Sequence, residues 1–438
     1  MGSNLPLKIL YVVPYVPSRI RTRPFHLIKA LALEGHRITL AAPWSNREEF
    51  AAFQELEGHV SILAERIAFA RSLWNCVCAL PTARPFQASY SWCPQLAKRL
   101  TGKLETEDFD VVHVEHLRGV RYALHLNETV KASGLRRPRL VWDSVDCISA
   151  LFRHAAHESS DFRSRLASRL ELARTEQLEG WLTTQFGEIL LTSESDRRDL
   201  LQLAANWHQR NGNGKAASLS SRITVVPNGV DLEYFSPSGE AREPLTLLIS
   251  GKMSYHANVT AVLRFVHKVM PKIWAELPET RLWIVGKNPS RIIQKLGTPW
   301  KESPSLGILR GGTSKSRIQI TGTVADIRPF LRKATVAVAP IQYGVGIQNK
   351  VLEAMACGTP VVATPQAVSA LQVQSGRDLI IAENLQDLAD SIISLLKNPG
   401  LRLKLAVSGR MYVEQQHEWR SIARDLTEIY RDASCHVS

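Results

Sequence analysis

The stretch VGIQNKVLEAMACGTPVV, residues 345–362, decides how this chain is interpreted. A glycine-led start leads into a helical pattern with one carboxylate, Glu353, and a Gly-Thr-Pro exit precedes a short apolar strand. Free amide hydrogens in a helix's first turn favour a pyrophosphate, so we expect the amides of Gly346, Ile347 and Gln348 to bind one. Both carboxylate oxygens of Glu353 can accept hydrogen bonds from ribose hydroxyls. The stretch predicts a nucleotide site, although an ordinary strand-turn-helix unit has the same local pattern.

Length and composition set the broad class. At 438 residues the chain is too long for one compact core and suits two domains. No apolar run approaches the roughly 18 to 20 residues of a membrane span, and the start, MGSNLPLKILYVV, lacks a signal-peptide layout. The six cysteines are scattered without C-x-x-C pairs, which argues against a disulfide framework and a zinc site. We expect a soluble protein of the reducing cytoplasm.

The net charge of +13 favours a polyanion, an acidic membrane surface or a phosphorylated substrate. No recognition helix, zinc-finger spacing or aromatic RNA-binding signature accompanies the charge, so we expect no nucleic-acid partner. Peripheral contact with the acidic inner face of a membrane fits the same surplus. Basic residues gather at Arg19, Arg21 and Arg23, and we hypothesise that they meet an acidic or phosphorylated acceptor.

The first half alternates short β-branched runs with longer helical patterns, which is typical of a parallel sheet. Its strand-like runs are KILYVV, HRITLAAP, DVVHVEH, RLVWDSV and EILLTS. Residues 150–186 have apolar residues at helical intervals and predict one or two long amphipathic helices. Residues 206–222 are polar and without period, which predicts a loop.

The second half repeats the rhythm, with LTLLISG, RLWIVG, IQITGTV, TVAVAPI and PVVAT as its strands. A Pro-Asn-Gly turn and Pro237 separate the halves, so we place the domains at residues 1–235 and 236–410, with a final helix over 411–438. The fold class is α/β, with two Rossmann-like parallel-sheet domains. Ligands of such sheets sit outside the carboxyl ends of the strands, so the strand-end residues should line one rim. They are Gly251, Gly286, Gly322 and Pro340.

A set of motifs spread over nearly the whole chain resembles the family 4 glycosyltransferases of the GT-B fold. They are KILYVVPY, GHRITLAAP, DVVHVEH, VPNGVD, ISGKM, IVGKNP, ITGTVADI and VLEAMACGTPVVAT. Within that family the chain is most similar to bacterial sugar transferases associated with exopolysaccharide and exosortase loci. The resemblance implies two domains facing a central cleft and a C-terminal helix that crosses back onto the first domain, where Trp419 and Tyr430 could pin it. It also implies retaining, metal-independent transfer of a sugar from a UDP- or GDP-type donor to a saccharide or lipid-linked acceptor.

The resemblance assigns roles in the second domain. Breaking the bond between a sugar and a diphosphate builds negative charge on the leaving group, which fixed donors must stabilise. Lys252, after Gly251, and Lys350 are the expected cations, with solvent-exposed lysines as the alternative. Glu353 matches the second Glu of the family's E-x7-E signature and should bind the ribose, unless it serves only the helix dipole. Val324 matches the segment that reads the base edge, unless its loop is purely structural.

In the first domain His116 lies just beyond a strand, where related enzymes carry a histidine that contacts the donor sugar. A neutral imidazole can donate or accept one hydrogen bond near the anomeric centre. His113 and Glu115 compete for that role. Asp143 and Asp146 could bind acceptor hydroxyls or cap the next helix. Their D-S-V-D spacing is not the D-x-D metal motif, so we expect no metal and no other cofactor.

Three departures from the family pattern keep an alternative open. Val345 stands where the first Glu of E-x7-E usually lies, and Asn258 stands near the place of a second basic residue. The first loop, PYVPSRIRTR, lacks the glycine pair common near the acceptor. The alternative is a binding or scaffold protein of a polysaccharide assembly system that keeps the fold without turnover. A dehydrogenase is excluded, because no G-x-G-x-x-G follows the first strand.

Overall fold

The computed structural model describes residues 5–19, 21–158, 162–211, 223–299, 317–343 and 347–432. Its contacts divide the chain into two compact units. Unit 1 comprises Met1–Asn228 and Trp419–Ser438, and unit 2 comprises Gly229–Glu418. The domain limits predicted from the sequence, after residues 235 and 410, stay predictions beside this division.

Unit 1 is built on a seven-stranded sheet in the order β3-β2-β1-β4-β5-β6-β7, with parallel neighbours. Its strands are β1 (Lys8–Val12), β2 (Arg37–Trp44), β3 (Ser61–Arg66), β4 (Val111–Glu115), β5 (Arg139–Val145), β6 (Glu188–Leu191) and β7 (Ile223–Val225). The central strand β1 is buried except at Lys8, and β4 is buried along its whole length although it carries His113 and Glu115, as expected for a parallel sheet covered on both faces.

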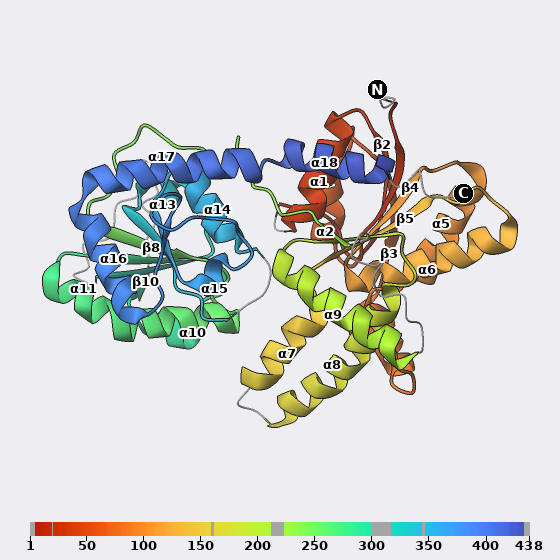
Figure 1. Cartoon of the computed structure of the whole chain (residues 1–438), viewed down its shortest axis with the longest axis horizontal. Coiled ribbons are helices and arrows are strands. Elements are labelled where there is room, and N and C mark those ends of the chain that lie inside the picture. The colour runs from red at the N-terminus through yellow and green to blue at the C-terminus, as the bar shows by residue number, and fades with distance from the viewer. Residues whose placement is uncertain are drawn as a thin grey trace. The chain divides into compact units, whose positions relative to one another are not determined.

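The helices of unit 1 follow the expected alternation. They are α1 (Thr22–Leu33), α2 (Arg47–Ala52), α3 (Phe69–Ala79), α4 (Phe86–Tyr90), α5 (Pro94–Thr106), α6 (His116–Ser133), α7 (Ile148–Glu158), α8 (Phe162–Leu182) and α9 (Glu194–Arg210). Figure 1 shows α7 and α8 side by side. The prediction of one or two long helices over residues 150–186 is confirmed, with two. The loop predicted over residues 206–222 is wrong at its start, because α9 continues to Arg210 with Leu203 and Ala204 buried in unit 1. Residues 212–222 of that loop lie outside the described residues.

The last helix, α18 (Trp419–Asp432), belongs to unit 1 and lies along α1 (Figure 1). The Trp419 ring stacks on the His26 ring, with centroids 5.5 Å apart and an angle of 8° between the planes. The Tyr430 side chain is 2% exposed and joins the same hydrophobic cluster. The predicted return of the C-terminal helix to the first domain, pinned by Trp419 and Tyr430, is confirmed. Residues 411–416, counted in that helix from the sequence, end the preceding helix instead.

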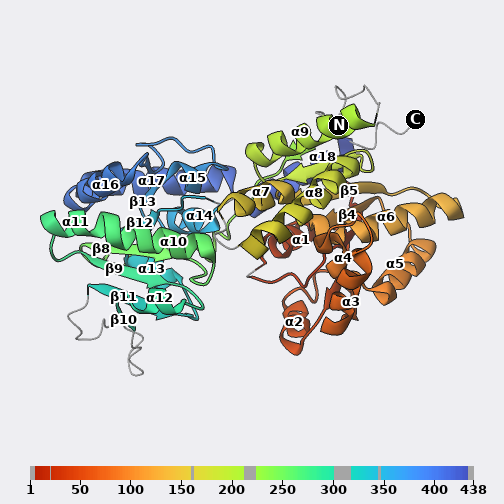
Figure 2. The ribbon, with the colours of Figure 1, turned by 90° about the horizontal axis from the view of Figure 1, so that it is seen from below.

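Unit 2 carries a second seven-stranded sheet, in the order β10-β11-β9-β8-β12-β13-β14, again with parallel neighbours (Figure 2). Its strands are β8 (Thr246–Ser250), β9 (Arg281–Val285), β10 (Thr298–Pro299), β11 (Ile318–Gly322), β12 (Val336–Ala339), β13 (Val361–Ala363) and β14 (Ile380–Ile381). Its helices are α10 (His256–Arg264), α11 (Met270–Glu276), α12 (Arg291–Gln294), α13 (Arg328–Lys333), α14 (Asn349–Ala356), α15 (Pro365–Val368), α16 (Leu385–Lys397) and α17 (Pro399–Gln416). The two Rossmann-like α/β domains predicted from the sequence are therefore confirmed.

Across the described ranges, the structure has no helix that is both apolar enough and long enough to span a membrane.

Candidate functional site

The rim at the carboxyl ends of the unit 2 strands depends on glycines. Gly251 follows β8 with φ 143°, and Gly286 follows β9 with φ 153°. A Cβ atom on Gly286 would lie 1.6 Å from the Gly251 carbonyl oxygen, so the two loops pack backbone against backbone. The Gly251 amide also donates to the Val285 carbonyl at 3.0 Å. A side chain at Gly286 would push the β8 loop away from the rim.

A lysine from α14 reaches this rim. The Lys350 ammonium donates a hydrogen bond to Asn258 Oδ1 at 2.6 Å, and Asn258 Nδ2 donates to the Lys252 carbonyl at 3.0 Å. A Cβ atom on Gly251 would lie 3.3 Å from Lys350 Nζ. The structure thus brings together Gly251, Lys252, Asn258 and Lys350. In the sequence, Asn258 stands out only because it lies near the place of a second basic residue, and the sequence alone assigns it no role. In the fold its amide holds Lys350 against the β8 loop.

Glu353 lies one turn after Lys350 on α14. Burial raises the pKa of Glu353 to about 7, although Lys350 pulls it down. Burial likewise lowers the pKa of Lys350 to about 8, although Glu353 raises it. The acid and the cation predicted for the nucleotide therefore both titrate near neutral pH, as groups of functional sites often do.

The start of α14 is described only in part. Ile347 and Gln348 come just before the helix, which begins at Asn349. Gly346, expected to bind phosphate, and Val345, the departure from the family pattern, lie outside the described residues. Val324, expected to read the base, is partly buried against the cluster that contains α14. The ligand contacts of these residues stay predictions.

In unit 1, His116 begins α6 directly after β4, with a positive φ of 63° that is rare for a residue with a side chain. Its ring Nδ1 accepts a hydrogen bond from the Arg118 amide at 3.2 Å. Burial, helped by the charge of Arg118, lowers the pKa of His116 to about 3. The imidazole is neutral at physiological pH, as its predicted contact with a donor sugar requires.

His113, the first competitor of His116, is fully buried inside unit 1. Its Nδ1 shares a hydrogen bond with the Tyr430 hydroxyl at 2.7 Å, and its ring stacks on Tyr11 with centroids 4.2 Å apart. Burial and nearby Arg23 hold its pKa well below the usual range. These contacts give His113 a structural role in attaching α18.

Glu115, the second competitor, is 1% exposed. Its two carboxylate oxygens accept hydrogen bonds from the hydroxyls of Tyr11 at 3.2 Å and Tyr15 at 2.8 Å. Burial, with the charge of Asp143, raises the pKa of Glu115 to about 8. His116 is therefore the least enclosed of the three candidates.

Asp143, expected to bind an acceptor, forms a buried ion pair. Arg23 approaches its Oδ2 atom with Nε at 2.8 Å and Nη2 at 2.7 Å, and both side chains are at most 4% exposed. Arg23 Nη1 also donates to the Val226 carbonyl at 3.0 Å. Both residues thus have partners inside unit 1, and the acceptor contacts expected of them stay predictions.

The helix-capping alternative for Asp143 and Asp146 is wrong. The first amides of α7, those of Ile148 and Ser149, donate to the Glu179 carboxylate at 2.8 and 3.0 Å. Asp146 instead accepts a hydrogen bond from the Thr192 hydroxyl at 3.4 Å, and burial, with the charge of Asp196, raises its pKa to about 7. Its predicted contact with an acceptor stays untested.

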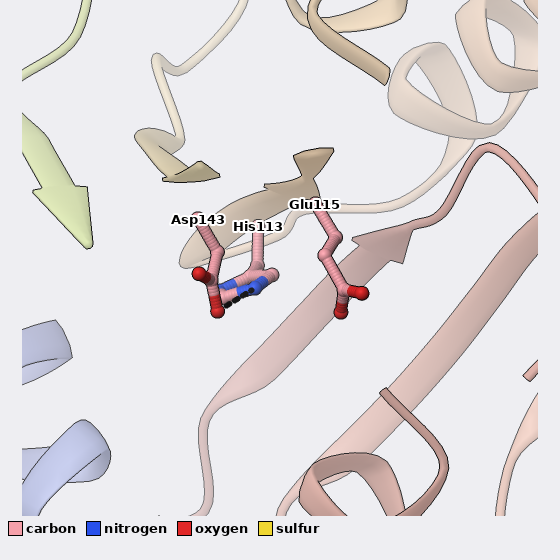
Figure 3. Close-up of side chains that lie close together, drawn as sticks. All are labelled: His113, Glu115 and Asp143. Carbon is pink, nitrogen blue, oxygen red and sulfur yellow. Dashed lines mark ion pairs between the residues drawn. The ribbon is translucent and has the colours of Figure 1, made fainter. Parts of the chain in front are cut away.

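Figure 3 shows His113, Glu115 and Asp143 converging from β4 and β5. Each offers one potential metal ligand, and these atoms lie within 4.8 Å of one another. Here Arg23 already provides the positive charge next to Asp143, and tyrosine hydroxyls occupy Glu115. The cluster can be explained as an internal charge network, and the independence from metal predicted from the sequence stays a prediction.

The two remaining arginines of the first loop lie nearer the surface. Arg19 pairs with Glu55 at 2.8 Å and has a side chain that is 62% exposed. Arg21 pairs with Glu49 at 3.1 Å, and its guanidinium lies 4.7 Å from the centroid of the Tyr15 ring. Both can reach a ligand only by sharing or exchanging these acidic partners.

A cavity of about 490 Å³ in unit 1 was not predicted from the sequence. Its walls come from α3, α4, α6, α7 and α8, and its lining residues are Cys76, Phe86, Gln87, Tyr90, Arg118, Phe152 and Glu171. Arg118 Nε donates to Gln87 Oε1 at 2.5 Å. The buried Oε2 atom of Glu171 makes no hydrogen bond with the described residues. Of these lining residues, only Arg118 lies near a position that the sequence singles out, because it follows His116 by two residues.

Comparison with known proteins adds three findings. Residues 244–398 match the family described as Glycosyl transferases group 1. This range includes Gly251, Asn258, Lys350 and Glu353. A phosphatidyl-myo-inositol mannosyltransferase of Mycobacterium tuberculosis is 26% identical over 240 residues, which cover 52% of this chain and 57% of that protein. A D-inositol 3-phosphate glycosyltransferase of Nocardioides sp. is 25% identical over 234 residues, which cover 50% of each chain. The chain thus spans about half the length of these relatives.

Solved structures match over nearly the whole chain. Anabaena HepE in complex with UDP-glucose has a TM-score of 0.61 at 14% identity, covering 97% of this chain and 100% of that one. A glycosyltransferase from Rickettsia africae has a TM-score of 0.61 at 14% identity, covering 99% and 100%. At this identity the likeness bears on the fold alone, and the fold is GT-B, as the sequence predicted.

Proposed function

We propose that the chain is a retaining glycosyltransferase that moves a hexose from a nucleoside diphosphate to a hydroxyl-bearing acceptor. The observation that carries the proposal is the constellation at the rim of the unit 2 sheet. Lys350 is held by Asn258 within reach of Gly251, and Glu353 lies on the next turn of the same helix. The match of residues 244–398 to the group 1 glycosyl transferases supports the same conclusion.

In the proposed reaction the Lys350 ammonium, with Lys252 and the amides of Ile347 and Gln348, stabilises the charge that grows on the departing diphosphate. Glu353 accepts hydrogen bonds from the ribose hydroxyls with its two oxygens. The neutral His116 imidazole contacts the donor sugar, and the leaving phosphate takes the acceptor proton. No metal is required in this scheme.

The donor base stays open between two chemistries. The Anabaena structure that shares the fold holds UDP-glucose, whereas a relative from Corynebacterium glutamicum, 25% identical over 214 residues, is named as GDP-mannose-dependent. In either case we assign the reading of the base edge to Val324, which is partly buried against the cluster that contains α14.

The acceptor proposal rests on the unit 1 cavity. The cavity has a volume of about 490 Å³ and is lined mainly by apolar and aromatic surface. Its polar groups include the guanidinium of Arg118 and a carboxylate oxygen of Glu171 that has no hydrogen-bond partner among the described residues. A saccharide hydroxyl or the headgroup of a lipid-linked acceptor has the polar atoms to satisfy both. The names of the inositol-lipid mannosyltransferases are consistent with a lipid-linked acceptor. A role in exopolysaccharide synthesis is the narrower prediction, which rests on the sequence resemblance.

Titration calorimetry with UDP and GDP, followed by turnover of UDP- and GDP-hexoses, tests the proposal. We expect one nucleoside diphosphate to bind and Glu353→Ala to abolish most of the heat, while Glu276→Ala, a surface acid in the same unit, changes nothing. Heat that persists in Glu353→Ala would overturn the site. Tight nucleotide binding without turnover of any donor would favour the scaffold alternative.

A further inference from the structure

Helix α3 carries its large apolar side chains on the solvent side. The exposed fractions are 67% for Phe69, 49% for Leu73, 58% for Trp74 and 52% for Val77, with 55% for Leu80 just after the helix. Phe69, Leu73, Val77 and Leu80 recur every three or four residues and so form one stripe, which Trp74 widens. Contiguous apolar surface of this kind usually marks an interaction site.

The opposite face of α3 is buried although its side chains are small or polar. Ser72, Asn75 and Ala79 are 4%, 8% and 3% exposed. Asn75 Nδ2 donates to the Trp92 carbonyl at 2.8 Å, and α3 packs against α4 (Figure 2). Turning the apolar stripe inward would break this part-buried hydrogen bond and leave the Trp92 carbonyl without its donor. The outward orientation of the stripe is therefore specified by the fold.

The surroundings of the stripe are cationic. Between Glu65 and Glu105 the sequence has no Asp or Glu. Arg71 and Arg84 are exposed. Burial lowers the pKa of Arg121, and the charges of Arg84 and Arg71 lower it further. No ion pair among the described residues involves these three arginines. A basic patch whose three arginines form no ion pair with the described residues thus borders the apolar stripe.

We propose that α3, with Leu80 and Arg84, is a docking surface for an anionic lipid bilayer. A helix with Trp, Phe and Leu on one face and arginines beside them lies in the membrane interface, with its apolar side chains among the acyl chains. The neighbouring arginines add attraction to acidic headgroups. The arginines beside the stripe form no ion pair with the described residues, and this favours a bilayer over an apolar protein partner. A protein groove that bound the stripe would also need acidic groups to neutralise these arginines, whereas an anionic bilayer provides them in its headgroups. The surface is independent of the sugar that the enzyme transfers.

Vesicle co-sedimentation tests this proposal with the full chain. The probes are vesicles of phosphatidylglycerol mixed with phosphatidylcholine, and vesicles of phosphatidylcholine alone. The test variants are Leu73→Ser with Trp74→Ser, which shortens the stripe, and Arg71→Gln with Arg84→Gln, which removes charge. All four side chains are exposed, so the fold should persist, and the melting temperature verifies it.

Helix α17 offers a matched control. It presents Leu403, Val407 and Met411 with exposed fractions of 67%, 54% and 50%, again at helical spacing. The double variant Leu403→Ser with Val407→Ser removes two exposed apolar side chains from α17 without touching α3.

We expect binding to the anionic vesicles, weakened by salt and much weaker on phosphatidylcholine alone. The stripe variant should bind the anionic vesicles at least about tenfold more weakly than the wild type. The loss of each arginine should weaken this binding about fivefold, and the α17 variant should bind almost as the wild type does. Equal binding by the wild type and the stripe variant would overturn the proposal, as would equal loss in the α17 variant. Absence of vesicle binding, with a concentration-dependent dimer that the stripe variant abolishes, would also overturn it and assign the face to a second copy of the chain.

Discussion

Replacing Lys350 with methionine tests the phosphate contact most directly. Methionine keeps the length and apolar stem of the side chain but removes the ammonium that Asn258 holds at the rim. A hydrogen bond to a charged group contributes about 1.5–3 kcal/mol, so Lys350→Met should weaken nucleoside diphosphate binding about 10- to 150-fold. Titration calorimetry at pH 7 measures this change. Lys397→Met, which removes a surface lysine paired with Glu276, is the control and should bind as the wild type does.

The pH dependence adds a second test of the same residue. The pKa of Lys350 in the free protein is about 8 because of burial, and a bound diphosphate raises it by favouring the charged form. Below pH 8 the lysine is already charged, so its titration does not change the affinity. Above pH 8 binding must take up a proton, and the wild-type affinity should fall about tenfold between pH 7 and pH 9.

The Lys350→Met protein cannot take up that proton. The factor by which it binds the nucleoside diphosphate more weakly than the wild type should therefore shrink about tenfold between pH 7 and pH 9. Two results would refute the assignment of Lys350 to the phosphates. One is a variant that binds as tightly as the wild type at pH 7, and the other is a difference in affinity between variant and wild type that is as large at pH 9 as at pH 7.

Three further predictions concern stability and the ribose. Glu353→Gln should weaken nucleotide binding, yet raise the melting temperature at pH 8 and change it little at pH 5. The folded-state pKa of Glu353 is about 7, so the wild type loses stability as the pH rises from the unfolded-state pKa toward 7, and the neutral glutamine avoids this loss. Thermal-shift measurements of both proteins at the two pH values check the sign. Arg23→Met leaves Asp143 buried without its partner and should cost about 3–5 kcal/mol in denaturant unfolding of unit 1, and full stability in this variant would contradict the ion-pair interpretation. Trp419→Ala removes the stack on His26 and should cost about 3–5 kcal/mol, seen as faster hydrogen exchange in α18, whereas unchanged exchange would show that the helix is held elsewhere.

Several features of the fold were predictable because they depend on local sequence. Alternating apolar runs and helical patterns indicate parallel strands with crossover helices, since side-chain period and turn chemistry act over a few residues. The strand-end glycines marked the rim of unit 2 for the same reason, and Gly251 and Gly286 do adopt conformations that favour glycine. The return of α18 to unit 1 came from the family resemblance rather than from any local pattern.

What the sequence by itself determined is the parallel α/β class, the rim of strand ends, and the residue types that can meet a diphosphate there. Only the tertiary structure decided which side chains meet. Asn258 holds Lys350 across 92 positions, and Arg23 neutralises Asp143 across 120 positions. Strand order and helix packing set such pairings, and they also turn the apolar stripe of α3 outward. A periodic pattern says that one face of a helix is apolar, but which face is buried depends on partners that are distant in the chain.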